Sequence, residues 1–424
     1  MKVLALSFYA PPQLTPQAIQ IGRQLYHLDA DVALLHSREA ALGDTYDQYP
    51  DFFQRIRGLE VPNPGPRLKG LLFRAARRLS PTYDDCPDLL GRWRTVACRQ
   101  AMEALPILPP DVIASFGMPM SDHLVALKIK RQTGLPWLAH FSDPWVDNPF
   151  YDRSWLSRRV NALMERQVIA AADQVIFTSE RTLDLMMRKY PPAWRDKAAV
   201  LPHAWDMDHF SGSAPTIPAR LPGVRHLIRY IGNCYGGRTP LPLFRALNLI
   251  ERRNPALLVD VSFQFVGYID ASFHDAVELT RLRPGLVTFL GQVGYRESLL
   301  LAKDADALLV IDADSTQPSV FLPSKLIEYI GVRRPVWGIT PPGTSADLIA
   351  EWADGSHASA PPADPEAVAR MLEHGLISLA ANAAARFGPE VVYQRFSPAA
   401  VSGALKEHLS RAISACCQAC DECS

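Results

Sequence analysis

The apolar positions of this chain form short runs of three to eight residues, separated by segments in which they recur every three or four positions. The first runs are residues 2–9 and 31–36, with an apolar-periodic segment over 18–27 between them, and others follow at 111–116, 136–141 and 173–178. Short apolar runs are typical of buried parallel strands, and the longer period is typical of amphipathic helices. Their alternation predicts an α/β fold with a doubly wound sheet.

A second series of the same kind begins at 227–231 and continues at 261–266, 287–289, 307–311 and 335–340. The segment between the two series, 208–223, is rich in Gly, Ser and Pro, a composition typical of a linker. We therefore predict an N-terminal domain over 1–207, a linker over 208–223 and a C-terminal domain over 224–388. A terminal helix is expected over 389–411, followed by a cysteine-rich tail over 412–424.

Composition limits the classes of function. The 424 residues suit two domains, and 48% hydrophobic with 21% charged residues is typical of a globular protein. Lys plus Arg equals Asp plus Glu, which argues against nucleic acid as the main partner. No apolar run reaches the roughly 18 residues of a membrane span, and the first apolar run is too short for a secretory signal. We expect a cytoplasmic protein.

Two segments have alternative interpretations. Cysteines crowd the end of the chain with a spacing that could hold zinc or an iron–sulfur cluster, but nothing around them offers supporting ligands, which favours a frayed tail: Cys416, Cys417, Cys420 and Cys423. Residues 67–79 combine basic and apolar positions in a helical pattern. Such a helix either packs its apolar stripe on the domain or lies on anionic lipid, at about 1 kcal/mol per basic residue.

The most informative stretch is 318–348. Pro323 fits a first helical position, Lys325 lies in the first turn, and Glu328 follows on the same face. The turn that ends at Gly343 can bring backbone N–H groups close to a ligand, and Thr344 or Ser345 can cap the next helix. Two helix N-termini at one strand end can bind phosphates, and a carboxylate can accept hydrogen bonds from a ribose diol. An ordinary capped helix with an ion pair is the alternative.

Other strand ends carry further candidates. The loop 232–240 contains Gly232, Gly236 and Gly237, which free the backbone, and Arg238, which can reach an anion; an ordinary strand–helix turn is the alternative. His123 and Asp143 follow strands of the first series and are acid–base candidates. A structural histidine and a turn-forming aspartate are their simpler interpretations.

The run PSKLIEYIG…RRPV…GITPPG resembles the nucleotide-sugar-binding segment of family 4 of the retaining glycosyltransferases, which have the GT-B architecture. Pro119-x-Ser-x-His123 and Asp143-Pro-Trp145 are similar to the same sub-branch, which builds bacterial surface polysaccharides. The resemblance implies two Rossmann-like domains facing each other across a cleft, with the terminal helix over 389–411 crossing back to the N-terminal domain. It also implies transfer of a sugar, with retention, from a nucleoside diphosphate to a hydroxyl of a glycan or lipid-linked acceptor. Association with the inner face of the membrane through 67–79 would suit such an acceptor.

The resemblance assigns roles to residues. Glu328 would hold the ribose, Arg238 and Lys325 the diphosphate, and His123 and Asp143 would face the acceptor and the reacting sugar. The donor-binding set is Gly232, Gly236, Gly237, Arg238, Lys325, Glu328, Gly343, Thr344 and Ser345. Basic groups at the diphosphate and helix dipoles favour a reaction that needs no metal and no cofactor, although Asp312-Ala-Asp314 also resembles a metal-binding Asp-x-Asp.

One departure leaves the donor open. The family motif has two glutamates, and Val320 stands where the first, which contacts the donor sugar, is expected. Asp312, Asp314 or the loop 343–345 could replace it. Two alternatives to a transferase follow: a sugar-nucleotide 2-epimerase of GT-B type, and a two-domain protein that binds a sugar nucleotide without chemistry.

Overall fold

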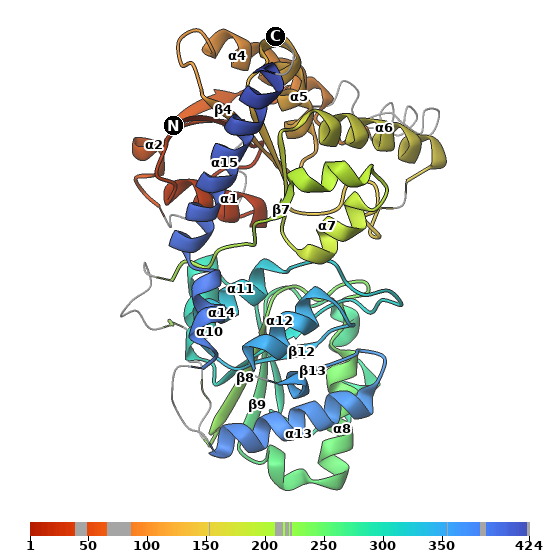
Figure 1. Cartoon of the computed structure of the whole chain (residues 1–424). Helices are drawn as coiled ribbons and strands as arrows, with labels where there is room; N and C mark the ends of the chain where they lie inside the picture. The colour runs from red at the N-terminus through yellow and green to blue at the C-terminus, as the bar shows by residue number, and fades with distance from the viewer. Residues whose placement is uncertain are drawn as a thin grey trace. The chain divides into compact units, whose positions relative to one another are not determined.

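The computed structural model describes residues 1–38, 49–65, 86–151, 153–207, 215–216, 220, 223–353, 355–381 and 387–421 (Figure 1). The chain forms two compact units. The first unit contains Met1–His203 together with Pro398–Ser424, and the second contains Ala204–Ser397. Segment 67–79, predicted to be a basic helix, lies outside the described residues, as does most of 208–223.

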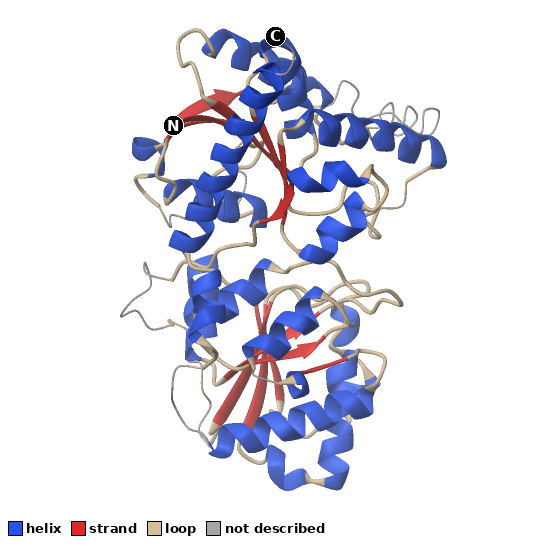
Figure 2. Ribbon diagram, viewed as in Figure 1, coloured by secondary structure: helices blue, strands red, loops and turns tan. Residues whose placement is uncertain are grey.

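The first unit is built on a seven-stranded parallel sheet in the order β3-β2-β1-β4-β5-β6-β7. Strands are drawn in red and helices in blue in Figure 2. Its strands are β1 (Lys2–Leu6), β2 (Asp31–Ser37), β3 (Arg57–Val61), β4 (Val112–Gly117), β5 (Trp137–Phe141), β6 (Gln174–Phe177) and β7 (Ala198–Val200). Its helices are α1 (Pro16–Tyr26), α2 (Phe52–Arg55), α4 (Gly91–Ala104), α5 (Ser121–Thr133), α6 (Trp155–Ala171), α7 (Glu180–Met187), a 3-10 helix over Pro192–Lys197, and α15 (Pro398–Asp421).

Helices cover the strands of the first unit. Helix α5 packs against β4 and contacts α4 and α6, while α15 packs against α1 and lies along β4, β5 and β6. Strands β4, β5 and β6 are buried along their whole length. Buried parallel strands of this kind are apolar at nearly every position, which explains why they could be predicted from short apolar runs.

The second unit repeats the design with six parallel strands in the order β10-β9-β8-β11-β12-β13. The strands are β8 (His226–Ile231), β9 (Val261–Val266), β10 (Val287–Gly291), β11 (Ala307–Ile311), β12 (Val336–Ile339) and β13 (Ser359–Ala360). The helices are α8 (Leu241–Arg253), α9 (Val277–Thr280), α10 (Tyr295–Asp304), α11 (Ser324–Gly331), α12 (Thr344–Trp352), α13 (Pro365–Ala381) and α14 (Glu390–Arg395), with 3-10 turns at Pro255–Leu258, Ala271–Phe273 and Ser356–Ala358.

Alternate side chains of β11 enter two different cores. Leu309 and Ile311 join the cluster formed with α8 and α13, whereas Leu308 and Val310 join the cluster formed with α10, α11 and α12. Successive side chains of a strand point to opposite faces, so both faces of this sheet are covered by helices. The prediction of an α/β fold with two doubly wound sheets is confirmed.

The end of the chain differs from the prediction of one helix over 389–411. Pro389 precedes α14 and Pro398 begins α15, so the proline residues split the segment into two helices. Helix α15 continues to Asp421, so the tail expected to be frayed is helical to that residue. Ser402 Oγ donates to the Gln24 carbonyl at 3.1 Å, which ties α15 to α1 within the first unit.

Neither a membrane-spanning helix nor a metal-binding cluster occurs in the described part of the chain. No helix in these ranges is both long enough and apolar enough to cross a membrane. Within the same ranges, no group of three or more His, Cys, Asp or Glu residues is arranged to hold a metal ion.

Candidate functional site

The second sheet reverses its strand order beside β8, because the chain moves from β8 to β9 and β10 on one side and then to β11, β12 and β13 on the other. The loop after β8 leads towards β9 and the loop after β11 leads towards β12, on opposite sides of the reversal. Ligands of open α/β sheets bind at such a reversal of strand order. The two loops approach each other here, since a methyl group added at Gly237 would lie 3.4 Å from Ala313 Cβ.

The loop 232–240, which follows β8, is fixed by backbone hydrogen bonds. Gly232 N–H donates to the Val266 carbonyl at 2.8 Å, and Arg238 N–H donates to the Tyr235 carbonyl at 3.1 Å. Gly236 has φ +57°, in the left-handed region that glycine tolerates best. Asn233 Oδ1 accepts from Tyr268 N–H at 3.0 Å, so this side chain stabilises the loop. Arg238 remains the basic side chain that the loop presents.

Glu328 lies on α11 and is 3% exposed. Its carboxylate accepts a hydrogen bond from the Tyr295 hydroxyl, at the first residue of α10. Lys325 Nζ lies 3.6 Å from Glu328 Oε2 and 5.7 Å from the centre of the Tyr295 ring. The predicted i,i+3 pair is thus present, and it includes a tyrosine that the spacing did not reveal.

Tyr329 connects α11 to the end of β8. The Ile231 N–H donates to the Tyr329 hydroxyl at 3.0 Å, and Tyr329 is fully buried. Pro323, predicted to be the first helical residue, is the N-cap, and α11 begins one residue later at Ser324. Gly331 is the last residue of α11, and a Cβ added to it would lie 2.7 Å from Trp205 Cβ, so close packing requires glycine there.

The turn before α12 contacts the loop that carries Val320. Gly343 has φ +139°, and a Cβ added to it would lie 2.2 Å from the Ser319 carbonyl oxygen. The Thr344 N–H donates to that oxygen at 2.9 Å, and Thr344 Oγ1 donates to the Val320 carbonyl at 3.1 Å. Neither Thr344 nor Ser345 caps α12, contrary to expectation, because Gly343 is the N-cap and Thr344 joins the two loops instead.

A set of buried polar atoms lies at these strand ends without hydrogen-bond partners among the described residues. They are Arg238 Nε, Asp312 Oδ2, Thr340 Oγ1 and Ser345 Oγ. Burial raises the pKa of Asp312, whereas the nearby Ser345 hydroxyl and the Arg238 charge lower it. Ser345 therefore lies beside Asp312. Native proteins rarely leave buried polar atoms unsatisfied, and such groups often mark a ligand site.

The two acidic residues of the Asp312-Ala-Asp314 segment differ in environment. Asp312 follows β11 and is half-buried, with its N–H bonded to the Ile339 carbonyl at 3.0 Å. Asp314 is exposed, and its Oδ1 accepts from the N–H of Ser315 at 2.9 Å. Asp312 alone belongs to the buried polar set.

In the first unit, His123 lies in the core. It is fully buried, its Nδ1 is 2.8 Å from Ser115 Oγ, and its ring centre is 4.3 Å from that of Phe141. A Cβ added at Gly117 would lie 2.4 Å from His123 Nε2, so the backbone covers that side of the ring. Burial, with a smaller effect of His140, lowers the pKa of His123 to about 3. This environment is that of a neutral structural histidine and argues against acid–base chemistry.

Asp143 directly follows the Ser142 that ends the hydrogen-bonded part of β5. Burial raises the pKa of its carboxyl to about 6, and Asp143 in turn contributes to a raised pKa of Tyr151, after burial. Its loop is held by α6, since Glu165 Oε2 accepts from Val146 N–H at 2.9 Å and Asn161 Oδ1 accepts from Trp145 Nε1 at 2.7 Å. Asp143 is the titratable candidate of this unit.

Sequence reasoning missed the side chain that binds the first residue of α5. Asp88 accepts from Ser121 N–H at 2.9 Å and from Ser121 Oγ at 2.6 Å. Asp122 Oδ2 accepts from Phe8 N–H at 2.9 Å. No local pattern could reveal Asp88, because it lies 33 residues away in sequence. Tyr295 escaped notice for the same reason.

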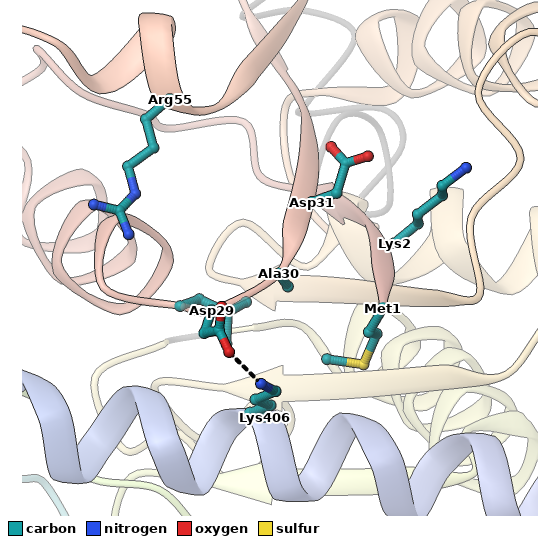
Figure 3. A pocket seen from close by; sticks show the side chains of 8 residues that line it. Met1, Lys2, Asp29, Ala30, Asp31, Arg55 and Lys406 are labelled. Atoms are coloured by element: carbon teal, nitrogen blue, oxygen red, sulfur yellow. Dashed lines mark hydrogen bonds and ion pairs between the residues drawn. The ribbon is translucent and has the colours of Figure 1, made fainter.

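A separate pocket of about 470 Å³ opens at the amino-terminal edge of the first sheet (Figure 3). It is lined by the first residues of β1 and β2, by Arg55, and by the ion pair of Asp29 with Lys406 of α15, whose charged atoms are 2.5 Å apart. Strand ends that carry the candidate residues lie at the opposite edge, so none of the predicted site residues lines this pocket.

Comparison with known proteins shows which family and which folds this chain is similar to. Residues 18–204 match the family of glycosyl transferase 4-like domains. The fold is similar to that of HepE from Anabaena in complex with UDP, at 17% identity and a TM-score of 0.61, with 97% of this chain and 100% of that one covered. It is also similar to sucrose-phosphate synthase from Thermosynechococcus elongatus, at 17% identity and a TM-score of 0.65, covering 98% and 99% of the two chains.

A third similar structure is a putative UDP-N-acetylglucosamine 2-epimerase from Listeria monocytogenes, at 12% identity and a TM-score of 0.51, with 96% and 97% of the chains covered. No curated protein matches the chain by sequence. Identities this low establish a common fold, and that fold is GT-B. The fold is shared by transferases and an epimerase, so the reaction has to be argued from the site.

Proposed function

We propose that this protein is a glycosyltransferase that moves a sugar from a nucleoside diphosphate sugar to a hydroxyl of a glycan or lipid-linked acceptor. The observation that carries the proposal is the group of charged and unpartnered polar side chains at the strand reversal of the second unit. Arg238 follows β8, Lys325 lies in the first turn of α11, and Asp312 with Ser345 lies near Arg238. Fixed cations at the N-termini of two helices fit a diphosphate.

In this proposal Arg238 and Lys325 neutralise the diphosphate as it leaves, and Glu328 accepts hydrogen bonds from the ribose. Tyr295 donates to the Glu328 carboxylate, so the ribose would replace its hydroxyl there. Gly232, Gly236, Gly237 and the turn at Gly343 let the backbone approach the donor. Preorganised charges of this kind stabilise the leaving group without a metal. Asp143 is the group we propose to face the acceptor hydroxyl.

UDP is the first nucleotide to test, because the HepE structures contain UDP, and one of them also contains glucose. The assay incubates the protein with UDP- and GDP-sugars, with and without candidate acceptors, in buffer with EDTA. Release of nucleoside diphosphate that requires an acceptor, with the donor's anomeric configuration kept in the product, is the expected result. Conversion of the sugar nucleotide without acceptor would establish an epimerase, and binding without turnover would establish a binding protein.

We also propose that the protein works in the cytoplasm, at the inner face of the membrane through 67–79. Described residues support a surface of this kind, because Phe150 and Trp155 are 68% and 75% exposed and Arg158 and Arg159 are exposed beside them. Exposed aromatic and basic side chains favour the membrane interface. Replacing Arg74, Arg77 and Arg78 with Ser should release the protein from anionic vesicles in a flotation assay. Wild-type protein that never floats with them would refute this location.

A further inference from the structure

We propose that Asp312 supplies the carboxylate that binds the hydroxyl groups of the donor sugar, the task for which the sequence offers only Val320. This inference rests on the proposed function and adds to it a residue that recognises the donor sugar. The resemblance places a glutamate eight residues before Glu328, and Val320 cannot accept a hydrogen bond through its side chain. If a carboxylate binds the donor sugar in this protein, another acidic residue has to supply it.

The position of Asp312 is fixed by the sheet. It follows β11, the strand next to β8 at the reversal of the strand order, and its N–H is bonded to the Ile339 carbonyl at 3.0 Å. The carboxylate therefore starts from a rigid strand end, beside the loop that carries Arg238. A residue held by a strand can orient hydroxyl groups more sharply than one on a free loop.

Its chemistry is that of an acceptor in need of donors. Asp312 Oδ2 is buried and has no hydrogen-bond partner in the described part of the chain. An unsatisfied buried carboxylate oxygen is unfavourable, and the hydroxyl of a bound sugar can satisfy it. The buried hydroxyls of Thr340 and Ser345, also without partners there, follow β12 and begin α12 and offer additional donors or acceptors.

The order of the chemical groups along a sugar nucleotide agrees with this assignment. Arg238 is near enough to Asp312 to affect its pKa, and we assign Arg238 to the diphosphate. In a sugar nucleotide the sugar is bonded directly to the second phosphate, so a group next to the diphosphate cation lies next to the sugar ring. Asp314 is excluded as the alternative because it is exposed and already accepts from the N–H of Ser315.

Titration calorimetry with UDP and with UDP-glucose or UDP-galactose, which differ only in the 4-hydroxyl, tests the role of Asp312. In Asp312→Asn we expect UDP affinity within twofold of wild type, and the additional affinity for the preferred UDP-sugar reduced at least fivefold. Asp314→Asn is the matched control and should behave as wild type. Equal weakening of UDP and UDP-sugar would overturn the proposal, because it would mean that Asp312 only positions Arg238. Unchanged binding of both would overturn it as well.

A second measurement guards against a variant that misfolds. Donor analogues that lack one sugar hydroxyl are bound to the wild type and to Asp312→Ser, and thermal unfolding verifies that each protein is folded. The loss caused by removing the right hydroxyl should be large in wild type and nearly absent in the variant, because the two changes delete the same contact. Losses that simply add for every hydroxyl would refute the contact. Failure of the wild type to bind any nucleoside diphosphate would instead refute the proposed function, and this inference with it.

Discussion

The two units share one sheet topology but use the carboxyl ends of their strands differently. In the first unit, the polar residues that follow β4 hydrogen-bond to other parts of the same unit: His123 to Ser115, and Asp122 to the N–H of Phe8. At the equivalent edge of the second unit, Arg238 Nε, Asp312 Oδ2 and Ser345 Oγ lack partners among the described residues. Both sets lie at strand ends, and both keep buried atoms without partners among the described residues, since Asp122 Oδ1 and His123 Nε2 also lack them. The second set differs because the Arg238 cation lies near the Asp312 carboxylate, whereas burial keeps the His123 ring neutral.

This difference teaches how to rank site candidates that fold analogy treats alike. His123 matched a sequence pattern, yet its contacts are those of a core residue. Asp143, two residues after β5, keeps a pKa of about 6 through burial and so can still exchange a proton near neutral pH. We therefore expect donor binding to depend on the second unit, and the first unit to contribute a single titratable group.

The largest effect is expected from Arg238→Ala. Removing a fixed cation from the leaving group should lower kcat a hundredfold or more, about 3 kcal/mol, the usual cost of losing one transition-state donor. Arg245→Ala is the control, because Arg245 lies on the adjoining helix α8 and pairs with Glu278 at its surface. Steady-state kinetics measures both variants. If kcat of Arg238→Ala falls less than threefold, Arg238 does not stabilise the leaving diphosphate.

Asp143→Asn should lower kcat by about a hundredfold, at the lower end of the range for a general base, and leave UDP affinity unchanged. The raised pKa of Asp143, about 6, predicts the direction in which activity changes with pH. The carboxylate form increases as pH rises through 6, so wild-type activity should fall about tenfold per unit below that pH, and the variant should lack this step. If Asp143→Asn instead weakens UDP binding, Asp143 belongs to the donor site, and the proposal that donor binding depends on the second unit is wrong.

Glu328→Ala should weaken UDP binding by roughly 1.5–3 kcal/mol, the range for hydrogen bonds to a charged group. Glu351→Ala, which removes a surface carboxylate paired with Arg395, is the control and should bind as wild type. Calorimetry measures both. If Glu328→Ala binds UDP normally, the ribose is not held by this carboxylate, and the second unit loses its main sequence signature.

His123 predicts an acid sensitivity that belongs to the first unit. Its folded pKa is about 3, against an ordinary value of 6.5, so the unfolded chain binds a proton more readily in between. The stability that the neutral ring contributes is present above pH 6.5 and is lost as pH falls towards 3, at up to about 1.4 kcal/mol per pH unit.

Denaturant unfolding at pH 7 and pH 5 measures this dependence. His123→Gln should be less stable than wild type at pH 7 and less sensitive to acid. His374→Gln, a change at an exposed position of α13, should keep the wild-type slope. Equal slopes in all three proteins would show that His123 does not titrate in the unfolding transition and would weaken its assignment to the core.

Sequence patterns predicted those parts of the molecule that depend on neighbours along the chain. Buried strands are apolar runs, the Lys325–Glu328 pair follows from helical spacing, and the turn at Gly343 from its composition. Contacts between distant segments left no such signal, as with Asp88 on α5. The unsatisfied state of Asp312 could not be predicted either, because it depends on which groups fail to reach it in three dimensions.

The smallest effect concerns Tyr295, which competes with the proposed ribose for Glu328. Its hydroxyl donates to the carboxylate, so a ribose that uses the same carboxylate has to replace that bond. A typical hydrogen bond contributes a net 0.5–1.5 kcal/mol, so Tyr295→Phe should tighten UDP binding by about twofold to tenfold while keeping the ring beside Lys325. Calorimetry of Tyr295→Phe and of the Tyr295→Phe, Glu328→Ala double variant tests the competition, since the gain should vanish once the carboxylate is gone. Weaker binding of Tyr295→Phe would instead mean that the hydroxyl contacts the nucleotide, which would make Tyr295 part of the donor site of the second unit.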